Sequence, residues 1–331
     1  MAITPLILGS GRAGHAIAKS LAILDVLRPE LEIQTPVWLE RGAVLDAERA
    51  RHENAVLCIS NPHALHAKSI IEGDRAGFNA ILCEKPAGVN MDDVRALRTV
   101  TTPTAVLHVI RQTWGIQTLK QMLVEGQFGE LVSIEGRYWQ ASAAERALQK
   151  SASASPKGWK NDAALSGEFD TYLDLATHWV DAATFLAGQR PERILGWRSF
   201  TNSEAPHRDT HVQLNIVYPA VRGFGSISKT FHGATNQFEI SIIGSKMSAT
   251  WEYLKPDEIV IGEGRDRRIV TRKSNDFGSQ HPAFHALGWL EGYIDIAARL
   301  FDNVYQGKGP AYPTLTSSLD MLETMLAVQW Q

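Results

Sequence analysis

The first part of the chain alternates short apolar runs with segments of helical spacing. The apolar runs, which read as strands, are residues 5–8, 35–39, 55–60, 80–83 and 105–110. Amphipathic segments follow the first and third runs, at residues 15–27 and 66–76, and Gly77 is placed to end the second segment as a C′ glycine. Strands that alternate with helices are typical of a parallel sheet covered on both faces. The pattern therefore predicts an α/β domain with a doubly wound parallel sheet.

Beyond about residue 120 the pattern changes to consecutive strand-like runs separated by short polar turns. These runs, most of which alternate or carry β-branched and aromatic residues, are 131–139, 193–200, 211–218, 223–231, 238–244, 249–254 and 258–262. Segments of helical spacing lie at 119–126, 171–186 and 293–305. Consecutive strands joined by short turns form a largely antiparallel sheet. We therefore expect an α/β domain over residues 1–120 and an α+β domain, with a large, mostly antiparallel open sheet, over 121–331.

Length and charge agree with this division and narrow the range of partners. A chain of 331 residues is long for one hydrophobic core and fits two domains. Its formal net charge of −3 gives no reason to expect a nucleic acid or a membrane surface as partner. No stretch approaches the roughly twenty apolar residues of a membrane span, and the N-terminus reads as carrying no export signal. We expect a small-molecule substrate and a cytoplasmic location.

The two cysteines, Cys58 and Cys83, both lie inside apolar runs. We therefore expect two buried thiols rather than a disulfide framework, as suits the reducing cytoplasm. No CxxC motif or Cys/His spacing indicates zinc. His281 and His285 have i, i+4 spacing, but no carboxylate or cysteine accompanies them, so we expect no metal site.

The string GSGRAG lies between the first predicted strand and the first predicted helix. In such a turn Gly9 allows the tight bend, Gly11 lets the backbone approach a pyrophosphate, and Gly14 lets the helix pack closely. The N–H groups and the dipole at the helix start, around Arg12 and Ala13, would then hold the phosphates. In this context the motif predicts a Rossmann dinucleotide-binding domain. The alternative is an ordinary glycine-rich turn between a strand and a helix.

Glu40 and Arg41 follow the second predicted strand. An acid at that strand end accepts hydrogen bonds from the ribose hydroxyls of NAD, whereas an arginine there could hold the ribose phosphate of NADP. Glu40 lies further from the glycines than the usual spacing of about twenty residues, and the extra length fits a loop at residues 28–32. The residues favour NAD and leave NADP as an alternative. A third reading is that both residues are solvated surface charges.

Polar residues also follow the third and fourth predicted strands. Asn61 and Pro62 come directly after Ser60, where doubly wound sheets place ligand loops. The tripeptide EKP, which contains Lys85, follows the fourth strand. A lysine held there can hydrogen-bond a substrate hydroxyl or carbonyl oxygen and stabilise alkoxide-like charge. The alternative, from the residues alone, is a surface lysine at a strand end.

The segment 171–186 places Asp174, His178 and Asp181 at i, i+4 and i+7, on one face of a predicted helix. A carboxylate one turn before a histidine can orient its ring and stabilise its protonated form. That imidazole can accept a proton from an alcohol as hydride leaves. The alternative is a structural Asp–His pair, and we assign Asp181 a structural or supporting part.

Together these motifs resemble the Gfo/Idh/MocA oxidoreductases, the group of glucose–fructose oxidoreductase and inositol dehydrogenase. The resemblance rests on GSGRAG, on NPHALH after the third strand and on EKP, and it extends through most of the chain. It implies that Lys85 lies in the active site near the nicotinamide. It also implies that Asp174 and His178 are the Asp-x-x-x-His pair of the family's dehydrogenases. Arg111 would help to shape the substrate pocket, although Trp114 stands where relatives usually have a proline. The alternative for Arg111 is an ion pair with an acid.

The cofactor that we expect from these residues is NAD, with NADP possible, and most of its ligands lie in loops at strand ends. The residues that we expect to bind it are Gly9, Gly11, Arg12, Ala13, Gly14, Glu40, Arg41, Ser60, Asn61, Pro62, His66, Glu84, Lys85 and Trp159. Trp159 is included because Trp159-Lys160 stands where relatives often have Trp-Arg near the cofactor. The domain over 121–331 would bind the substrate and form the dimer or tetramer that is common in the family.

The sequence thus predicts an NAD(P)-dependent oxidoreductase that transfers hydride between nicotinamide and a carbinol or ketone of a sugar, polyol or cyclitol. In this hypothesis His178 is the general base or acid, Lys85 holds and polarises the reacting oxygen, and Asp174 orients the substrate or His178. Two alternatives stay open: a catalytically silent nicotinamide-binding regulator or scaffold, and a reductase of a non-sugar substrate. The intact catalytic set favours an enzyme because a pure binder does not need it.

Overall fold

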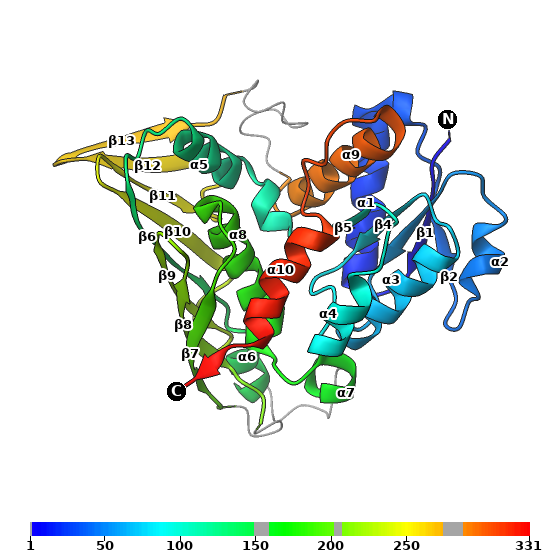
Figure 1. Cartoon of the computed structure of the whole chain (residues 1–331), viewed down its shortest axis with the longest axis horizontal. Helices are drawn as coiled ribbons and strands as arrows, with labels where there is room; N and C mark the ends of the chain where they lie inside the picture. The colour runs from blue at the N-terminus through cyan, green and yellow to red at the C-terminus, as the bar shows by residue number, and fades with distance from the viewer. Residues whose placement is uncertain (1, 149–158, 202–206, 274–286) are drawn as a thin grey trace. The chain divides into compact units, whose positions relative to one another are not determined.

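The computed structural model describes residues 2–148, 159–201, 207–273 and 287–331 (Figure 1). The chain divides into two compact units. The first is Met1–Gln112 with Leu287–Leu322, and the second is Thr113–Ala286 with Glu323–Gln331. The sequence placed one boundary at residue 120, so the return of Leu287–Leu322 to the first unit differs from that expectation. His281 and His285 lie outside the described residues.

The first unit contains a five-stranded sheet in which all strands are parallel, in the order β2-β1-β3-β4-β5. The strands are β1 (Thr4–Leu8), β2 (Val37–Leu39), β3 (Ala55–Ile59), β4 (Ala80–Cys83) and β5 (Thr104–Val106). The sheet confirms the predicted parallel fold. The last strand is shorter than expected, because the chain turns after β5 into the 3₁₀ helix η3 (Val109–Gln112).

Helices cover both faces of this sheet. On one face α1 (Arg12–Leu27) packs against α9 (Leu290–Gln306), and on the other α3 (His66–Arg75) packs against α4 (Met91–Leu97) (Figure 1). Strand residues alternate between the two faces. The core under α1 and α9 includes Ile7, Ile17, Leu21, Val56, Leu82, Ile294 and Phe301. The late segment of the chain therefore completes the hydrophobic core of the first unit.

The close packing of α3 depends on Gly73. A Cβ atom at this position would lie 2.6 Å from the Leu57 side chain and 3.2 Å from that of Ile81. Only a residue without a side chain lets the helix approach the sheet at this distance.

The two cysteines lie in this sheet, on β3 and β4, and both are free and fully buried. Burial raises the pKa of the Cys58 thiol to about 12 and also raises the pKa of the Cys83 thiol. A thiol that resists ionisation is a poor nucleophile and metal ligand. The structure confirms the interpretation of both cysteines as buried small side chains.

The second unit is built on a nine-stranded sheet in the order β13-β12-β11-β10-β6-β9-β8-β7-β14. Its strands are β6 (Leu131–Trp139), β7 (Arg193–Ser199), β8 (His211–Val217), β9 (Arg222–Ser228), β10 (Gln237–Gly244), β11 (Ser248–Glu252), β12 (Glu258–Glu263), β13 (Asp266–Thr271) and β14 (Gln329–Trp330). Neighbours are antiparallel except in the pairs β6–β9 and β7–β14. The predicted open, mostly antiparallel sheet is confirmed, with β13 and β14 as additional strands.

Helices α5 (Trp114–Val124) and α8 (Thr177–Ala187) lie on one face of this sheet (Figure 1). The indole of Trp179, on α8, is fully buried there. It fits because Gly136 and Gly225 leave room: a Cβ atom at either position would lie 2.8 Å from the ring. Paired glycines on neighbouring strands thus allow α8 to approach the sheet closely.

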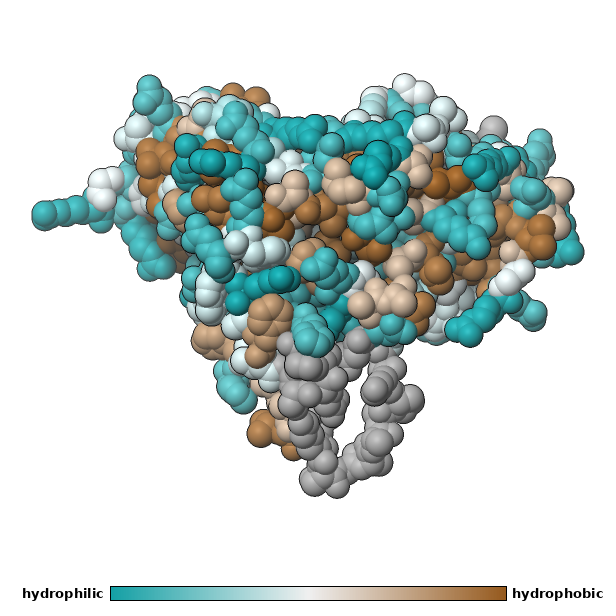
Figure 2. All heavy atoms as spheres, turned by 60° about the horizontal axis from the view of Figure 1, so that its bottom comes forward, coloured by the Kyte–Doolittle hydropathy of each residue, from teal (hydrophilic) through white to brown (hydrophobic). Residues whose placement is uncertain are grey.

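The remaining elements are short helices and one C-terminal helix. They are α2 (Leu45–Arg49), α6 (Ser142–Leu148), α7 (Ala163–Ser166), α10 (Leu315–Leu326), the 3₁₀ helices η1 (Pro29–Leu31), η2 (His63–Leu65) and η4 (Trp159–Asn161), and the π-helix η5 (Tyr172–Ala176). Hydrophilic residues cover much of the face shown in Figure 2, with hydrophobic residues interspersed. Among the described residues, no helix has the length and apolar character needed to cross a membrane.

Candidate active site

The glycine turn lies at the point where the order of the first sheet reverses. From β1 the chain passes to β2 on one side, and from β3 it continues to β4 and β5 on the other. The loops after β1 and β3 therefore flank the crevice in which open α/β sheets bind ligands. Gly9 has φ +114°, and a Cβ atom there would lie 2.7 Å from the Ser60 carbonyl. The two loops can meet at this distance only because Gly9 lacks a side chain.

Gly14 is held even more tightly. A Cβ atom at this position would lie 2.2 Å from the Gly9 carbonyl oxygen and 2.8 Å from the Ser60 hydroxyl. That hydroxyl in turn donates a hydrogen bond of 2.9 Å to the Gly9 carbonyl. The start of α1 is thus packed against the turn itself, which agrees with the close approach expected of Gly14.

Gly11 differs because it faces open space. It is the N-cap residue of α1, and a Cβ atom there would meet nothing within 4 Å among the described atoms. Within the described residues, no side chain caps the helix and no acid lies in its first turn. The N–H groups around Arg12 and Ala13 therefore present the positive end of the helix dipole, which is a site for an anionic group. The residues present fit a dinucleotide pyrophosphate.

Glu40 and Arg41 immediately follow β2, which pairs with β1 in parallel register. Both side chains are exposed. They lie at the strand end where a ribose or its phosphate would be recognised. The expectation that Glu40 favours NAD, with Arg41 leaving NADP as an alternative, stays a prediction.

His66 connects the loops after β3 and β4. Its Nδ1 lies 2.7 Å from the Pro86 carbonyl oxygen, and its Nε2 lies 2.8 Å from the Asn61 carbonyl oxygen. The ring has no exposed surface. The expectation that His66 binds the cofactor stays a prediction. Burial lowers the pKa of His66, so a neutral ring is favoured and one nitrogen donates. His66 therefore holds the two loops together through both of its ring nitrogens.

Asn61 and Pro62 remain at the end of β3, where the sequence placed them. The amide nitrogen of Asn61 donates a hydrogen bond of 2.9 Å to the Ser69 hydroxyl on α3. This contact ties the turn to the helix that follows it. The turn is thus fixed from both sides, by His66 and by Ser69.

Lys85 follows β4 directly and is buried, with 6% of its surface exposed. The neighbouring Glu84 is also buried, and its carboxylate accepts a hydrogen bond from the Tyr293 hydroxyl on α9. The backbone N–H of Glu84 donates to the Ile59 carbonyl, 2.9 Å away. Because Glu84 is held by α9 and by β3, the position of Lys85 depends on a segment from the far end of the chain. Lys85 is therefore not the exposed strand-end lysine that was the alternative reading of the sequence.

Arg111 is in the 3₁₀ helix η3 and is buried. The next residue, Gln112, donates a hydrogen bond of 3.0 Å to the Ala311 carbonyl. This bond ties η3 to the segment that returns from the C-terminal part of the chain. A part for Arg111 in substrate binding stays a prediction.

In the second unit, Asp174 and His178 lie where a π-helix passes into an α-helix. Asp174 belongs to η5 and His178 to α8, so the first turn of the predicted helix is wider than a regular one. Such π segments are rare and occur often at functional sites. His178 is half-buried, and its ring meets the Tyr138 ring edge-on at a centroid distance of 6.1 Å. Asp181 is buried one turn further along α8, in agreement with a structural part.

The start of this helix is anchored by Asp209. Its two carboxylate oxygens accept the backbone N–H groups of Asp170 and Tyr172, each at 2.7 Å. Burial raises the pKa of Asp209, and these two hydrogen bonds counteract that shift only in part. An acid from a segment distant in sequence thus replaces the usual local N-cap.

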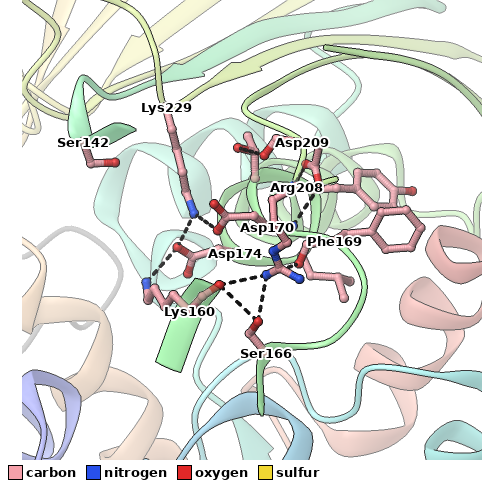
Figure 3. Close-up of polar contacts among 12 residues, drawn as sticks. Ser142, Lys160, Ser166, Phe169, Asp170, Asp174, Arg208, Asp209 and Lys229 are labelled. Atoms are coloured by element: carbon pink, nitrogen blue, oxygen red, sulfur yellow. Dashed lines mark hydrogen bonds and ion pairs between the residues drawn. The ribbon is translucent and has the colours of Figure 1, made fainter. Parts of the chain in front are cut away.

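Arg208, next to that acid, is buried and binds the same region (Figure 3). Its guanidinium donates to the Ser166 hydroxyl at 2.7 Å, to the Lys160 carbonyl at 3.0 Å and to the Phe169 carbonyl at 3.2 Å. The fork of donors of one arginine therefore holds the chain on both sides of α7. The consecutive pair Arg208-Asp209 organises the loop that leads to Asp174.

Asp174 lies between two lysines (Figure 3). Its Oδ2 atom is 2.8 Å from the Lys229 ammonium and 2.8 Å from the Lys160 ammonium. Lys229 also pairs with Asp170. Burial alone would lower the pKa of Lys229, but the combined attraction of Asp174 and Asp170 outweighs it and raises the pKa. Lys229 is therefore charged, and it compensates two carboxylates at once.

Trp159 begins the short 3₁₀ helix η4, and the Lys160 ammonium lies 5.7 Å from the centre of its ring. The aromatic residue thus accompanies the lysine that contacts Asp174. The expectation that Trp159 binds the cofactor stays a prediction.

Sequence reasoning missed the residues that support the Asp–His pair. Lys229 is a single lysine that follows strand β9. Arg208 and Asp209 are two adjacent charged residues just before strand β8, and nothing in the sequence distinguishes them from other charged pairs. Only the fold brings them to Asp170 and Asp174. Among the described residues, no group of three His, Cys, Asp or Glu side chains could hold a metal ion.

Fold and site together define a two-domain protein with a Rossmann-type dinucleotide-binding unit and an open-sheet unit that carries an Asp-x-x-x-His helix. Residues 116–250 match the family model of the GFO/IDH/MocA C-terminal domain. This match agrees with the resemblance to the Gfo/Idh/MocA oxidoreductases that the motifs suggested.

Known relatives span nearly the whole chain. Levoglucosan dehydrogenase of Pseudarthrobacter phenanthrenivorans is 25% identical over 335 residues, covering 85% of this chain and 83% of that protein. Inositol 2-dehydrogenase of Rhizobium meliloti is 23% identical, covering 85% of this chain and 87% of that protein. A solved structure of levoglucosan dehydrogenase, in complex with NADH and levoglucosan, matches with a TM-score of 0.81 at 21% identity, over 99% of this chain and 98% of that one. The fold is therefore shared with that enzyme.

The anchor at the start of η5 gives a stability prediction. Asp209→Asn leaves one carbonyl oxygen and places an N–H donor near a backbone N–H group, so a buried donor loses its acceptor. We expect the free energy of unfolding to fall by about 1–3 kcal/mol, measured by urea denaturation. Asp162→Asn is the matched control, because exposed Asp162 caps α7 through one hydrogen bond and asparagine caps equally well. Equal stability of both variants would contradict the anchoring part of Asp209.

Proposed function

We propose that the protein is an NAD-dependent dehydrogenase that transfers hydride between nicotinamide and a carbinol or ketone carbon of a sugar, polyol or cyclitol. The glycine turn carries the proposal: it lies at the switch point of the first sheet and leaves the N-terminus of α1 open to an anion. Relatives named as dehydrogenases of levoglucosan and inositol support the substrate class. A cytoplasmic location stays part of the proposal.

The first unit supplies the cofactor site. We assign the pyrophosphate to the N–H groups at the start of α1, the adenosine ribose to Glu40, and the nicotinamide half to the loops after β3 and β4. Arg41 beside Glu40 keeps NADP open as a second choice. The solved relative with bound NADH supports NAD. When bound, the nicotinamide supplies the hydride chemistry, and the protein supplies orientation and electrostatics.

The second unit supplies the proton-transfer group. In the proposed reaction the His178 imidazole accepts the hydroxyl proton of the alcohol during oxidation and returns it to the oxygen during reduction. The Lys85 ammonium donates a hydrogen bond to that oxygen and stabilises its developing negative charge. Asp174 holds a neighbouring negative charge that favours protonated His178 or orients substrate hydroxyls. Arg111 and Trp159 are assigned to the walls that bind substrate and cofactor.

The proposal also includes a homo-oligomer, a dimer or tetramer, formed through the sheet face opposite α5 and α8. A shallow groove on that face is lined by Glu135, Gln213 and Asn215 together with the aromatic residues Trp197 and Phe224. Both aromatic side chains are exposed, at 47% and 44%. Apolar rings surrounded by polar groups have the composition of a protein–protein interface.

Oligomer formation is tested by Phe224→Lys. A buried ammonium without a partner would oppose association, so we expect the mass measured by analytical ultracentrifugation to fall to that of a smaller species. Val26→Lys, which changes an exposed apolar residue on α1, serves as the control and should leave the mass unchanged. If Phe224→Lys associates like the unmodified protein, the sheet face is not the interface.

Dinucleotide binding is the first measurement. Titration with NADH and NADPH, followed by nicotinamide fluorescence and tryptophan quenching, should show tighter binding of NADH if Glu40 recognises the ribose. A preference for NADPH would assign recognition of the ribose phosphate to Arg41.

Gly11→Ala should weaken dinucleotide binding about tenfold or more, because its methyl group would meet the pyrophosphate while the fold stays intact. Gly309→Ala, at another glycine in open space, is the control and should bind normally. Binding of neither dinucleotide by the folded, nucleotide-free protein would refute the proposed function.

Turnover tests the proton-transfer and oxygen-binding parts. On a sugar or polyol that the protein oxidises with NAD, we expect His178→Asn to lower kcat about 100-fold or more. Lys85→Ala should lower kcat/KM by a comparable factor. NADH affinity of the His178 variant should stay unchanged. His232→Asn and Lys255→Ala change exposed residues of the same types and serve as controls. Full activity of either active-site variant would remove that residue from the mechanism.

A further inference from the structure

Two lysines pair with the same oxygen atom of Asp174 but differ in burial. Both ammonium groups lie 2.8 Å from Oδ2. The Lys229 side chain is 3% exposed, whereas the Lys160 side chain is 47% exposed. An ion pair that water can reach contributes little and exchanges partners, whereas a buried pair cannot lose one member without a large penalty. The two contacts therefore cannot serve the same purpose.

The backbone of Lys229 is fixed on both sides. Its N–H donates to the Thr210 carbonyl at 2.9 Å, and its carbonyl accepts the Ala143 N–H at 2.8 Å. It directly follows β9, in the middle of the nine-stranded sheet. Lys160, by contrast, lies in the single turn η4. The ammonium of Lys229 is thus delivered by a rigid element, as is needed to hold another side chain in place.

The charges around Lys229 explain why one cation meets two acids. Asp170 and Asp174 both pair with it, and both carboxylates are buried. Without Lys229, two like charges would lie close together in a poorly solvated site, and one of them would take up a proton. Other ionisable groups around the cluster are Lys160 on η4, Tyr138 on β6, His178 on α8 and the pair Arg208-Asp209 before β8.

We propose that Lys229 is a positioning residue that keeps the Asp174 carboxylate ionised and fixed beside His178, and that Lys160 is the exchangeable partner displaced by substrate hydroxyls. The Asp170–Lys229–Asp174 bridge is then a permanent part of the protein. The Lys160–Asp174 contact opens when a polyol donates a hydroxyl hydrogen bond to Asp174 and accepts one from Lys160. This inference rests on the proposed function, because it assigns parts in that reaction.

The first test compares Lys229→Gln with Lys160→Gln, the same change at two cations of equal distance from one oxygen. In Lys229→Gln we expect kcat to fall about tenfold or more. The acid limb of the plot of kcat against pH should move up by about one to three pH units, because the carboxylates hold a proton more easily without the cation. In Lys160→Gln we expect KM to change several-fold, with kcat and the acid limb nearly unchanged, because solvent screens that pair. The reverse pattern, or equal effects in both, would overturn the assignment.

A second variant separates positioning from a general loss of structure. Asp170→Asn added to Lys229→Gln removes the excess negative charge and leaves Asp174 paired with Lys160. We expect the acid limb of the double variant to return toward that of the unmodified protein. If Lys229 were only structural, the losses of activity from the two changes would add or reinforce each other, and the acid limb would not return. That outcome would overturn the proposal.

Unfolding supplies a readout that needs no substrate. Because the pKa of Lys229 is raised in the folded state, its contribution to stability is full below the unfolded value of about 10.4 and is lost as pH rises through the folded value. The stability difference between Lys229→Gln and the unmodified protein should therefore be large at neutral pH and shrink above about pH 10.5. A difference that is independent of pH would mean that Lys229 is not the charged centre of the bridge. If the unmodified protein shows no turnover with any sugar or polyol while the stability difference still depends on pH, the proposed function is refuted and the charged bridge at Lys229 is not.

Discussion

A buried cation requires opposite charge within hydrogen-bonding distance, and this requirement organises the second unit. Lys229 is charged and almost inaccessible to water, so Asp170 and Asp174 have to lie beside it. Asp170 and Asp174 can do so only if the π-helix η5 begins at the right place, and Asp209 fixes that place through two backbone N–H groups. The segment that carries His178 is thus aligned by electrostatic compensation as much as by apolar packing.

In the first unit the corresponding constraint is space. The turn after β1, the start of α1 and the loop after β3 approach each other so closely that Gly9 and Gly14 could not carry a Cβ atom. Gly11, one position before α1, has no described atom within 4 Å of the place that a Cβ atom would take. The contrast separates glycines that build the turn from the glycine that leaves room for a ligand. His66 then joins the loops after β3 and β4, so that the Asn61 turn and Lys85 are placed by the same buried ring.

The sequence predicted the elements that obey a local rule. Apolar strands, alternating strands and the glycine turn depend on period and on single-residue geometry, and most strand ends were found to within a few residues. The return of α9 to the first unit and the pairing of β14 with β7 depend on contacts between distant segments, which no local pattern records. The π-helix was read as a regular helix because the residues of 171–186 keep an ordinary helical spacing. Lys229 was missed for a similar reason, since one lysine after a strand normally faces solvent.

Burying the charged side chain of Lys229 costs free energy of desolvation that an apolar side chain would not cost. Replacing a buried ion pair by well-packed apolar side chains is often neutral or stabilising, so stability alone does not explain why an ammonium and two carboxylates occupy this position. An apolar residue at position 229 would leave Asp174 with the exposed Lys160 as its charged neighbour, and that contact is open to water and to exchange. Only a buried cation can hold an ionised carboxylate in one orientation while the exposed side of the same group remains available to a ligand. The structure therefore favours a functional reason for the buried charge. His178, four residues after Asp174 and half-buried at the start of α8, is the group that such a fixed carboxylate would serve.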